Sequence, residues 1–208
     1  MHHGRRIGRR TVVGGLAGGI ASLALAGGHP ALGQRSRTKE ATWESDDGAL
    51  TATYDTAIWH DIGSGTAPSN GLTLATDPTY GRPRYWLSLG SGDVIWSSVE
   101  DASANAQAEW FSQGMNGSVV AEEFTTDTAY GWVHYADFQG DPRTVSVIQY
   151  ELDGEGGMTT VMMSIDAEAF ETLDIGEVFD AVSLNDDSVF VIAPQRTMIR
   201  AIEDAFAD

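Results

Sequence analysis

The sequence predicts an α+β domain, in which an antiparallel sheet of about six or seven strands carries helices packed on its faces. Runs with alternating apolar residues, typical of half-buried strands, recur before residue 166. The connections between the last of these runs are too short for parallel strands, which need a crossover of about a dozen residues or more. Segments with a single apolar stripe follow, and such helices need a sheet face to cover.

Three consecutive strands form the centre of the predicted sheet. The connections between them, Gly140-Asp141-Pro142 and Asp153–Gly157, consist of residues that favour tight turns. The segment from Tyr130 to Asp166 is therefore predicted to be an antiparallel meander. Its strands are Tyr130–Gln139, Arg143–Leu152 and Met158–Ile165.

Shorter alternating runs earlier in the chain predict further strands. Leu50, Ala52 and Tyr54 share one face of such a run, because side chains two apart point the same way in a strand. Gly63–Gly71 is predicted to be a loop, and Gly90-Ser91-Gly92 a turn. The other runs are Trp43–Ser45, Ile58-Trp59, Leu72–Leu74, Tyr85–Leu89 and Val119–Thr125.

A first helix is predicted from Asp101 to Met115, capped by Asp101 or Ser103 and ended by Gly114 and Gly117. Its apolar residues recur at helical spacing and so form one stripe. They are Ala104, Ala108, Phe111 and Met115.

Three helices are predicted after the sheet. Asp166 can cap a short one that runs through Leu173, and Asp174 can cap a second. A C-terminal helix spans residues 194–206, with Pro194 at its first position. The second helix carries the stripe Ile175, Val178, Phe179 and Val182, and the last carries Ile199, Ile202 and Phe206.

Residues 1–33 are predicted to be a twin-arginine signal peptide. No acidic residue precedes Glu40, and the pair Arg9-Arg10 lies just before an apolar segment. That segment, Val12–Ala26, is shorter than the roughly 20 residues that a membrane-spanning helix needs. An ordinary secretory signal and an uncleaved anchor are the alternatives. Small residues allow cleavage after Gly33 or after Ala26.

The signal predicts a prokaryotic protein that works outside the cytoplasm, in the cell envelope or secreted, and that passes the twin-arginine export machinery. Residues 34–41 are then a flexible leader, and residues 42–208 form a single α+β domain. No stable membrane insertion is expected after cleavage.

Composition narrows the chemistry further. The chain has 12 basic and 30 acidic residues and a net charge of −18, so it is expected to repel nucleic acid and anionic membranes. It has no cysteine, which excludes disulfides, thiolate metal sites, a cysteine nucleophile and a lipid-modified N-terminal cysteine.

The order of these elements resembles the PsbP-like family of secreted α/β domains. The resemblance rests on Trp43, Ser45, Gly48, Leu50, Tyr54-Asp55, Trp59 and the ending Phe170–Leu184. It implies an α-β-α sandwich used for binding or as an accessory to a larger assembly, without a shared catalytic signature. The chain departs from the photosynthetic members in its twin-arginine signal and its additional C-terminal helix. No photosystem role or ion-binding residue is therefore transferred.

The sequence singles out no catalytic, cofactor-binding or metal-binding residue. His60 and His134 are the histidines of the mature chain, and neither lies at a metal-binding spacing. His134 is predicted to be a half-buried strand residue, and His60 a loop or strand-end residue. Asn185-Asp186-Asp187 lacks the ligand spacing of an EF-hand loop. A pair of carboxylates distant in sequence stays possible.

Six tryptophans favour a packed core, while an exposed row of them would favour sugar binding. They are Trp43, Trp59, Trp86, Trp96, Trp110 and Trp132. The sequence thus predicts a secreted, non-catalytic binding or accessory domain without a cofactor, whose partner is an unknown protein or small molecule. The alternative is a secreted hydrolase that uses carboxylates with His60 or His134.

Overall fold

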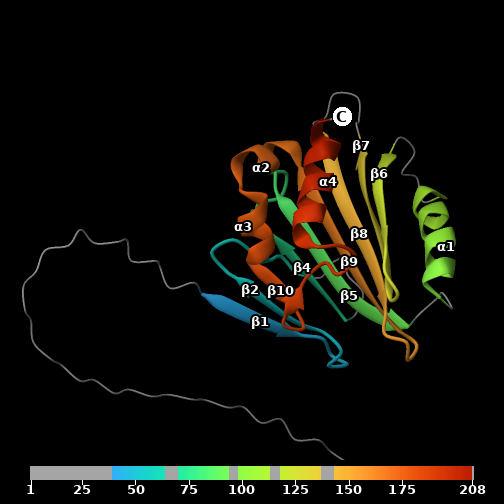
Figure 1. The fold of residues 1–208 in the computed structure, drawn as a ribbon. Helices are drawn as coiled ribbons and strands as arrows, with labels where there is room; N and C mark the ends of the chain where they lie inside the picture. The colour runs from blue at the N-terminus through green and yellow to red at the C-terminus, as the bar shows by residue number, and fades with distance from the viewer. Residues whose placement is uncertain (1–38, 64–69, 94–97, 113–117, 137–142, 208) are drawn as a thin grey trace, which may run out of the picture. The chain divides into compact units, whose positions relative to one another are not determined.

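A computed structural model describes residues 39–63, 70–93, 98–112, 118–136 and 143–207 of the chain (Figure 1). Side chains are described throughout these ranges except at positions 106, 107 and 109–112. Arg37–Asp208 forms one compact unit. Two antiparallel sheets and four helices make up its described part, which confirms the predicted α+β class. The predicted signal lies outside the described residues and stays a prediction.

The large sheet has seven strands, and each neighbouring pair in it is antiparallel. The three predicted central strands are neighbours within it, which confirms the meander. In spatial order the strands are β3 (His60–Asp61), β4 (Gly71–Ala75), β5 (Tyr85–Asp93), β9 (Gly157–Asp166), β8 (Thr144–Leu152), β7 (Ala129–Ala136) and β6 (Ser118–Thr125).

Strand β5 is longer than its apolar pattern indicates. Gly90-Ser91-Gly92, predicted to be a turn, lies inside the strand opposite Thr160, Thr159 and Met158. The prediction is wrong because β9 is ten residues long and offers a partner along all of β5. Glycine weakens a strand but does not forbid one.

A second, smaller sheet joins the two ends of the domain. It consists of β1 (Glu40–Glu44), β2 (Thr51–Asp55), β10 (Val182–Leu184) and β11 (Asp187–Ser188), in that order. The prediction of one sheet is therefore incomplete. Glu40 and Ala41, predicted to be leader, pair with Asp55 and Tyr54. The predicted leader therefore does not include Glu40 and Ala41, and residues 34–38 lie outside the described ranges.

Helix α3 (Ile175–Asp180) is shorter than predicted. Asp174 caps it as expected, because its carboxylate accepts a hydrogen bond from the Glu177 amide at 3.0 Å. Val182, however, lies in β10 opposite Tyr54 instead of extending the helical stripe. A β-branched residue packs well in a strand, and the pairing with β2 gives its backbone a ladder.

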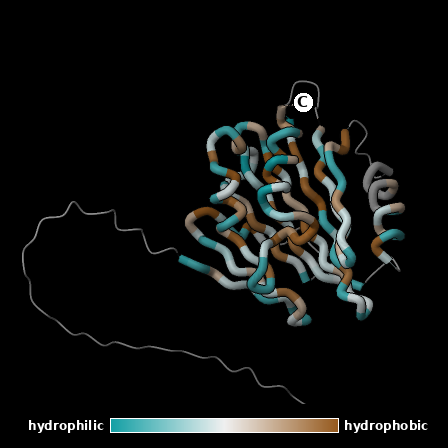
Figure 2. Tube along the Cα trace, in the orientation of Figure 1, coloured by the Kyte–Doolittle hydropathy of each residue, from teal (hydrophilic) through white to brown (hydrophobic). Residues whose placement is uncertain are grey.

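The two faces of the large sheet have different cover (Figures 1 and 2). Val133, Val147 and Met163 face one core, which they share with Met198 and Ile202 of α4 (Gln195–Ala207). The small sheet and α3 contribute to the same core through Ala52, Tyr54, Val178 and Phe179, among others. On the other face, Trp132 and Ile148 pack with Val99 and Ala102 of α1 (Val99–Ser112).

Helix α1 begins at Val99, two residues before the predicted start. Ser98 caps it, since its hydroxyl accepts a hydrogen bond from the Asp101 amide at 3.2 Å. Neither Asp101 nor Ser103 is the cap, because both lie inside the first turns. Ala104 and Ala108 are exposed, so the predicted apolar stripe is wrong at these positions. The structure does not describe the side chain of Phe111, nor does it describe residues 114, 115 and 117.

Asp166 precedes α2 (Ala167–Thr172) but makes no side-chain hydrogen bond to it. Its carboxylate instead accepts from the Arg84 amide at 3.0 Å and so ties the end of β9 to the chain before β5. The predicted C-terminal helix is confirmed as α4, although Pro194 lies just before it. The Pro194 carbonyl accepts from the amides of Thr197 and Met198.

A buried polar contact fixes the segment that leads into α4. Gln149 in β8 is fully buried, and its Oε1 accepts hydrogen bonds from the amides of Val191 and Ile192 at 2.7 and 3.1 Å. Gly131 lies opposite Gln149, where a Cβ atom would approach Ile192 Cδ1 to 2.6 Å. The segment therefore passes close over the sheet. No helix in the described ranges is long and apolar enough to cross a membrane.

Candidate functional site

The two candidate histidines lie in one row across the large sheet but far apart. The strand registers connect them through Ala75, Trp86, Ser164 and Ser146. His60 in β3 and His134 in β7 are thus separated by five strand spacings, about 24 Å along the sheet. They cannot share a metal ion or a proton relay.

His134 is more deeply buried than predicted, with 2% of its surface exposed. Burial lowers the pKa of His134 from 6.5 to about 4, so the imidazole is neutral at pH 7. Its ladder neighbour is Ser146, whose hydroxyl is hydrogen-bonded to that of Ser164 at 2.9 Å. This surrounding fits a structural histidine.

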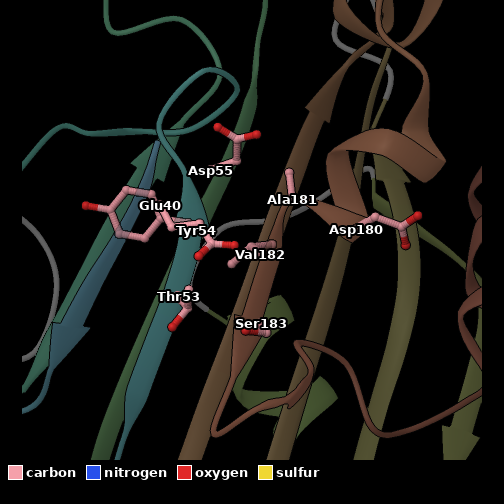
Figure 3. A pocket seen from close by; sticks show the side chains of 8 residues that line it. All are labelled: Glu40, Thr53, Tyr54, Asp55, Asp180, Ala181, Val182 and Ser183. Atoms are coloured by element: carbon pink, nitrogen blue, oxygen red, sulfur yellow. The ribbon is translucent and has the colours of Figure 1, made fainter. Parts of the chain in front are cut away.

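A large open hollow lies where turns of both sheets meet. We call it the turn hollow; its volume is 710 Å³, compared with 180 Å³ for the hollow in Figure 3. Its walls come from the β1–β2 turn, the end of β5 and the β8–β9 turn. They include Asp47, Ala49, Asn70, Ser91–Asp93, Asp153 and Glu155–Thr159.

Asp47 organises one wall of the turn hollow. Its Oδ1 accepts hydrogen bonds from the Ser45 hydroxyl at 2.6 Å and the Ala49 amide at 3.0 Å. Its Oδ2 accepts from Asn70 Nδ2 at 3.1 Å and from the Ser91 hydroxyl at 2.9 Å. The hydrogen bond from Ser45, followed by those from Ala49 and Ser91, lowers the pKa of Asp47. An ionised carboxylate thus ties the small sheet to β5.

Asp153 organises the opposite wall in the same manner. Its Oδ1 accepts from the amides of Glu155 and Gly157 at 2.7 and 2.8 Å, and these bonds lower the pKa of Asp153. Gly154 and Gly156 have φ values of 78° and 105°, which glycine adopts readily. Asp93 and Glu155 also line the hollow and are exposed. The walls are therefore strongly negative.

The smaller hollow in Figure 3 gathers Glu40, Asp55 and Asp180 around the junction of β1, β2 and β10. Two of these acids have structural partners. Asp55 accepts from the Ala57 amide at 2.8 Å, and Asp180 accepts from Gln195 Nε2 at 2.8 Å. In the view of Figure 3 the carboxylates of Asp55 and Asp180 do not converge. This hollow therefore has no focused chemical site.

Within the described ranges, no group of three or more histidine and acidic side chains is placed to hold a metal ion. Asn185-Asp186-Asp187 forms the turn between β10 and β11, in which Asn185 and Asp186 have positive φ values of 51° and 65°. Asn185 Oδ1 accepts from the Thr51 amide at 2.8 Å. The asparagine therefore joins this turn to β2.

The described tryptophans contribute mainly to packing. Trp59 and Trp132 are fully buried, and Trp59 Nε1 donates to the Val178 carbonyl at 3.1 Å. Trp43 and Trp86 are half-buried and lie in different sheets, so they form no common sugar platform. Trp96 and the side chain of Trp110 lie outside the description.

Comparisons with known proteins assign no family. No family model and no curated protein sequence matches the chain. Among solved structures, the Ran-binding protein Mog1p of Saccharomyces cerevisiae is 9% identical over 62% of this chain and 78% of its own, with a TM-score of 0.45. A mutant form of Mog1 gives the same identity and TM-score over 67% of this chain and 80% of that one. Matches at this level support no functional inference.

Sequence reasoning missed Asp47, Asn70 and Ser91 as a connected group. Asp46-Asp47-Gly48 was recognisable as a turn between two strands, and the local bonds of Asp47 agree with that. Its contacts to Asn70 and Ser91 span 23 and 44 residues. Such contacts follow from how the two sheets meet, which no local pattern indicates.

Proposed function

We propose that the chain is an extracytoplasmic binding or accessory domain, exported folded by the twin-arginine route, and that the turn hollow is its binding site. The observation that carries the proposal is the hydrogen-bonded junction at Asp47, which holds turns of two sheets around one open hollow. Binding residues commonly lie on loops that a rigid scaffold positions. A PsbP-like sandwich used as an accessory module is consistent with this arrangement.

The chemistry of the walls selects a positively charged partner. Asp47 and Asp153 are ionised at neutral pH, as carboxylates ordinarily are, and hydrogen bonds lower the pKa of each further; Asp93 and Glu155 add exposed carboxylates. The net charge of −18 also attracts cations and repels nucleic acid. We assign the site to a lysine- or arginine-rich segment of a protein partner outside the cytoplasm.

The hydrolase alternative gains no support from the positions of the histidines. A general base must reach the proton that it removes, directly or through one water. His134 is buried, and His60 lies in β3, away from the described residues that line the turn hollow. The binding function is therefore the better supported of the two.

Binding of a labelled oligolysine peptide tests the proposed site. We expect the Asp93→Asn, Glu155→Gln double variant to weaken binding several-fold, because it removes two carboxylates from the hollow. The Asp127→Asn, Glu168→Gln variant removes the same charge at exposed positions elsewhere and should bind nearly as the wild type does. Equal losses in both variants would reduce the interaction to net charge, and the proposed site would be abandoned.

Export is tested by substitutions in the predicted signal. Arg9→Lys with Arg10→Lys should leave the precursor in the cytoplasm, because the twin-arginine route reads the guanidinium pair whereas other secretory signals need only positive charge. Arg5→Lys with Arg6→Lys is the matched control and should be exported. Cell fractionation and immunoblotting measure both. Normal export of the Arg9, Arg10 variant would contradict the assigned route.

A further inference from the structure

We propose that Asn70 is a site of spontaneous deamidation, in which the backbone nitrogen of Gly71 attacks the side-chain amide. Asparagine is among the chemically labile residues of proteins. The following residue decides how easily the ring closes, and glycine has no side chain to hinder the approach. Asn70 belongs to the turn hollow, so the modification would change that site.

The strand register leaves the attacking nitrogen of Gly71 without a ladder bond to β5. Gly71 lies opposite Gly90, and the Ser91 amide donates to the Asn70 carbonyl at 3.3 Å. Hydrogen-bonded and non-hydrogen-bonded pairs alternate along an antiparallel ladder. Because Asn70 and Ser91 are hydrogen-bonded to each other, the next pair, Gly71 and Gly90, is a non-hydrogen-bonded one. The Gly71 N–H therefore points away from β5.

On the opposite edge of β4, the described part of the chain ends its pairing before Gly71. Strand β3 pairs with β4 only at Ala75 and Leu74, and the ladder continues with the bond from the Ile62 amide to the Thr73 carbonyl. Gly71 lies beyond that bond, and within the described ranges its amide has no acceptor. Attack by this nitrogen therefore breaks no ladder bond between β4 and β5.

Two other asparagines in the described ranges lack this combination. Asn105 lies inside α1, where the amide of the following Ala106 is part of the helical ladder. Asn185 precedes Asp186, whose side chain hinders ring closure. The side chains of both make hydrogen bonds, to the Asp101 carbonyl and from the Thr51 amide, as that of Asn70 does to Asp47, so the residue that follows is what distinguishes Asn70. They serve as internal controls.

The reaction needs only water as a co-reactant. The Gly71 nitrogen forms a bond to the Asn70 side-chain carbon and loses its proton, while Asn70 Nδ2 leaves as ammonia. Water then opens one of the two carbon–nitrogen bonds of the resulting five-membered imide. Opening on one side gives aspartate at position 70, and opening on the other gives isoaspartate with the chain running through the side-chain carbon.

Deamidation would weaken the junction at Asp47. Asn70 Nδ2 donates to Asp47 Oδ2 at 3.1 Å, and the product replaces this donor with a second carboxylate. Of the two donors to Asp47 Oδ2, only the Ser91 hydroxyl would remain. Like charges at this distance repel one another. A regulatory role for deamidation rests on the proposed function, in which the turn hollow is the binding site. As the protein ages, the modification would loosen this hollow and make it more negative.

Mass spectrometry of the aged protein tests the modification itself. The folded, processed protein is incubated at mildly alkaline pH, and proteolytic fragments are scored for the mass gain of amide-to-acid conversion. Asn70 should convert several-fold faster than Asn105 and Asn185, with an isoaspartate product, and Asn70→Gln should remain unmodified. Equal rates at the three sites would overturn the proposal. The fragment with Asn116-Gly117, which lies outside the described ranges, is scored separately. No partner is required, so this result does not depend on the binding proposal.

The Asn70→Asp variant tests the consequence for the junction. Its melting temperature should fall below that of the wild type, and added salt should restore part of the loss by screening the repulsion from Asp47. Asn105→Asp adds the same charge at an exposed position of α1 and should melt near the wild type. Equal melting of the two variants would show that the modification has no structural effect and would remove its regulatory role.

Discussion

Replacing Phe179 with alanine is expected to lower the free energy of unfolding by about 3 to 5 kcal/mol. Phe179 lies in α3 with 4% of its surface exposed, and its ring contacts that of Phe190 with centroids 5.6 Å apart. The substitution would leave a cavity where α3 and the small sheet cover the large one. A domain of this size has a stability of roughly 5 to 15 kcal/mol, so the loss is a large fraction of it.

Urea denaturation of Phe179→Ala and Leu173→Ala measures this effect. Leu173 follows α2 with 39% of its surface exposed, so its truncation should move the midpoint little. If the urea midpoint of Phe179→Ala were as close to that of the wild type as the midpoint of Leu173→Ala is, α3 would not seal the core.

Acidification is expected to destabilise the domain through His134. Its folded pKa of about 4 lies below the reference value of 6.5, so the fold favours the neutral imidazole. The contribution of neutral His134 to the free energy of unfolding is fully present above pH 6.5 and is lost as the pH falls toward 4. A shift of this size corresponds to about 3 kcal/mol.

His134→Gln removes the titrating group and should flatten the dependence of unfolding free energy on pH in this window. His60→Gln is the matched control and should keep the acid loss, because it leaves His134 in place. Urea denaturation at neutral and mildly acidic pH measures both. An acid loss in His134→Gln as large as in the wild type would assign the effect to other groups.

The sequence indicates the central meander well because its signals are local. Asp153-Gly154-Glu155-Gly156-Gly157 is rich in turn formers, and the chain reverses there with Gly154 and Gly156 at positive φ. The second sheet has no comparable signal. It requires Val182 to pair with Tyr54, a contact between distant parts of the chain that the helical spacing of Val182 conceals.

The candidate site shows the same limit. Each turn around the hollow is recognisable from its glycine and aspartate residues, yet their convergence depends on the register of β4, β5 and β9. The sequence likewise predicts His134 to be half-buried, whereas it is almost fully buried. The alternation of apolar and polar residues indicates which face of the strand a residue lies on, but it does not indicate what covers that face.

Mapping the oligolysine peptide onto the isotope-labelled domain by NMR tests the proposed binding site most directly. We expect saturable shifts of backbone amides around the turn hollow, foremost at Asp47, Asn70, Ser91 and Glu155, with little change at the hollow of Glu40 and Asp180. Shifts spread evenly over the acidic surface, or centred on Glu40 and Asp180, would contradict it.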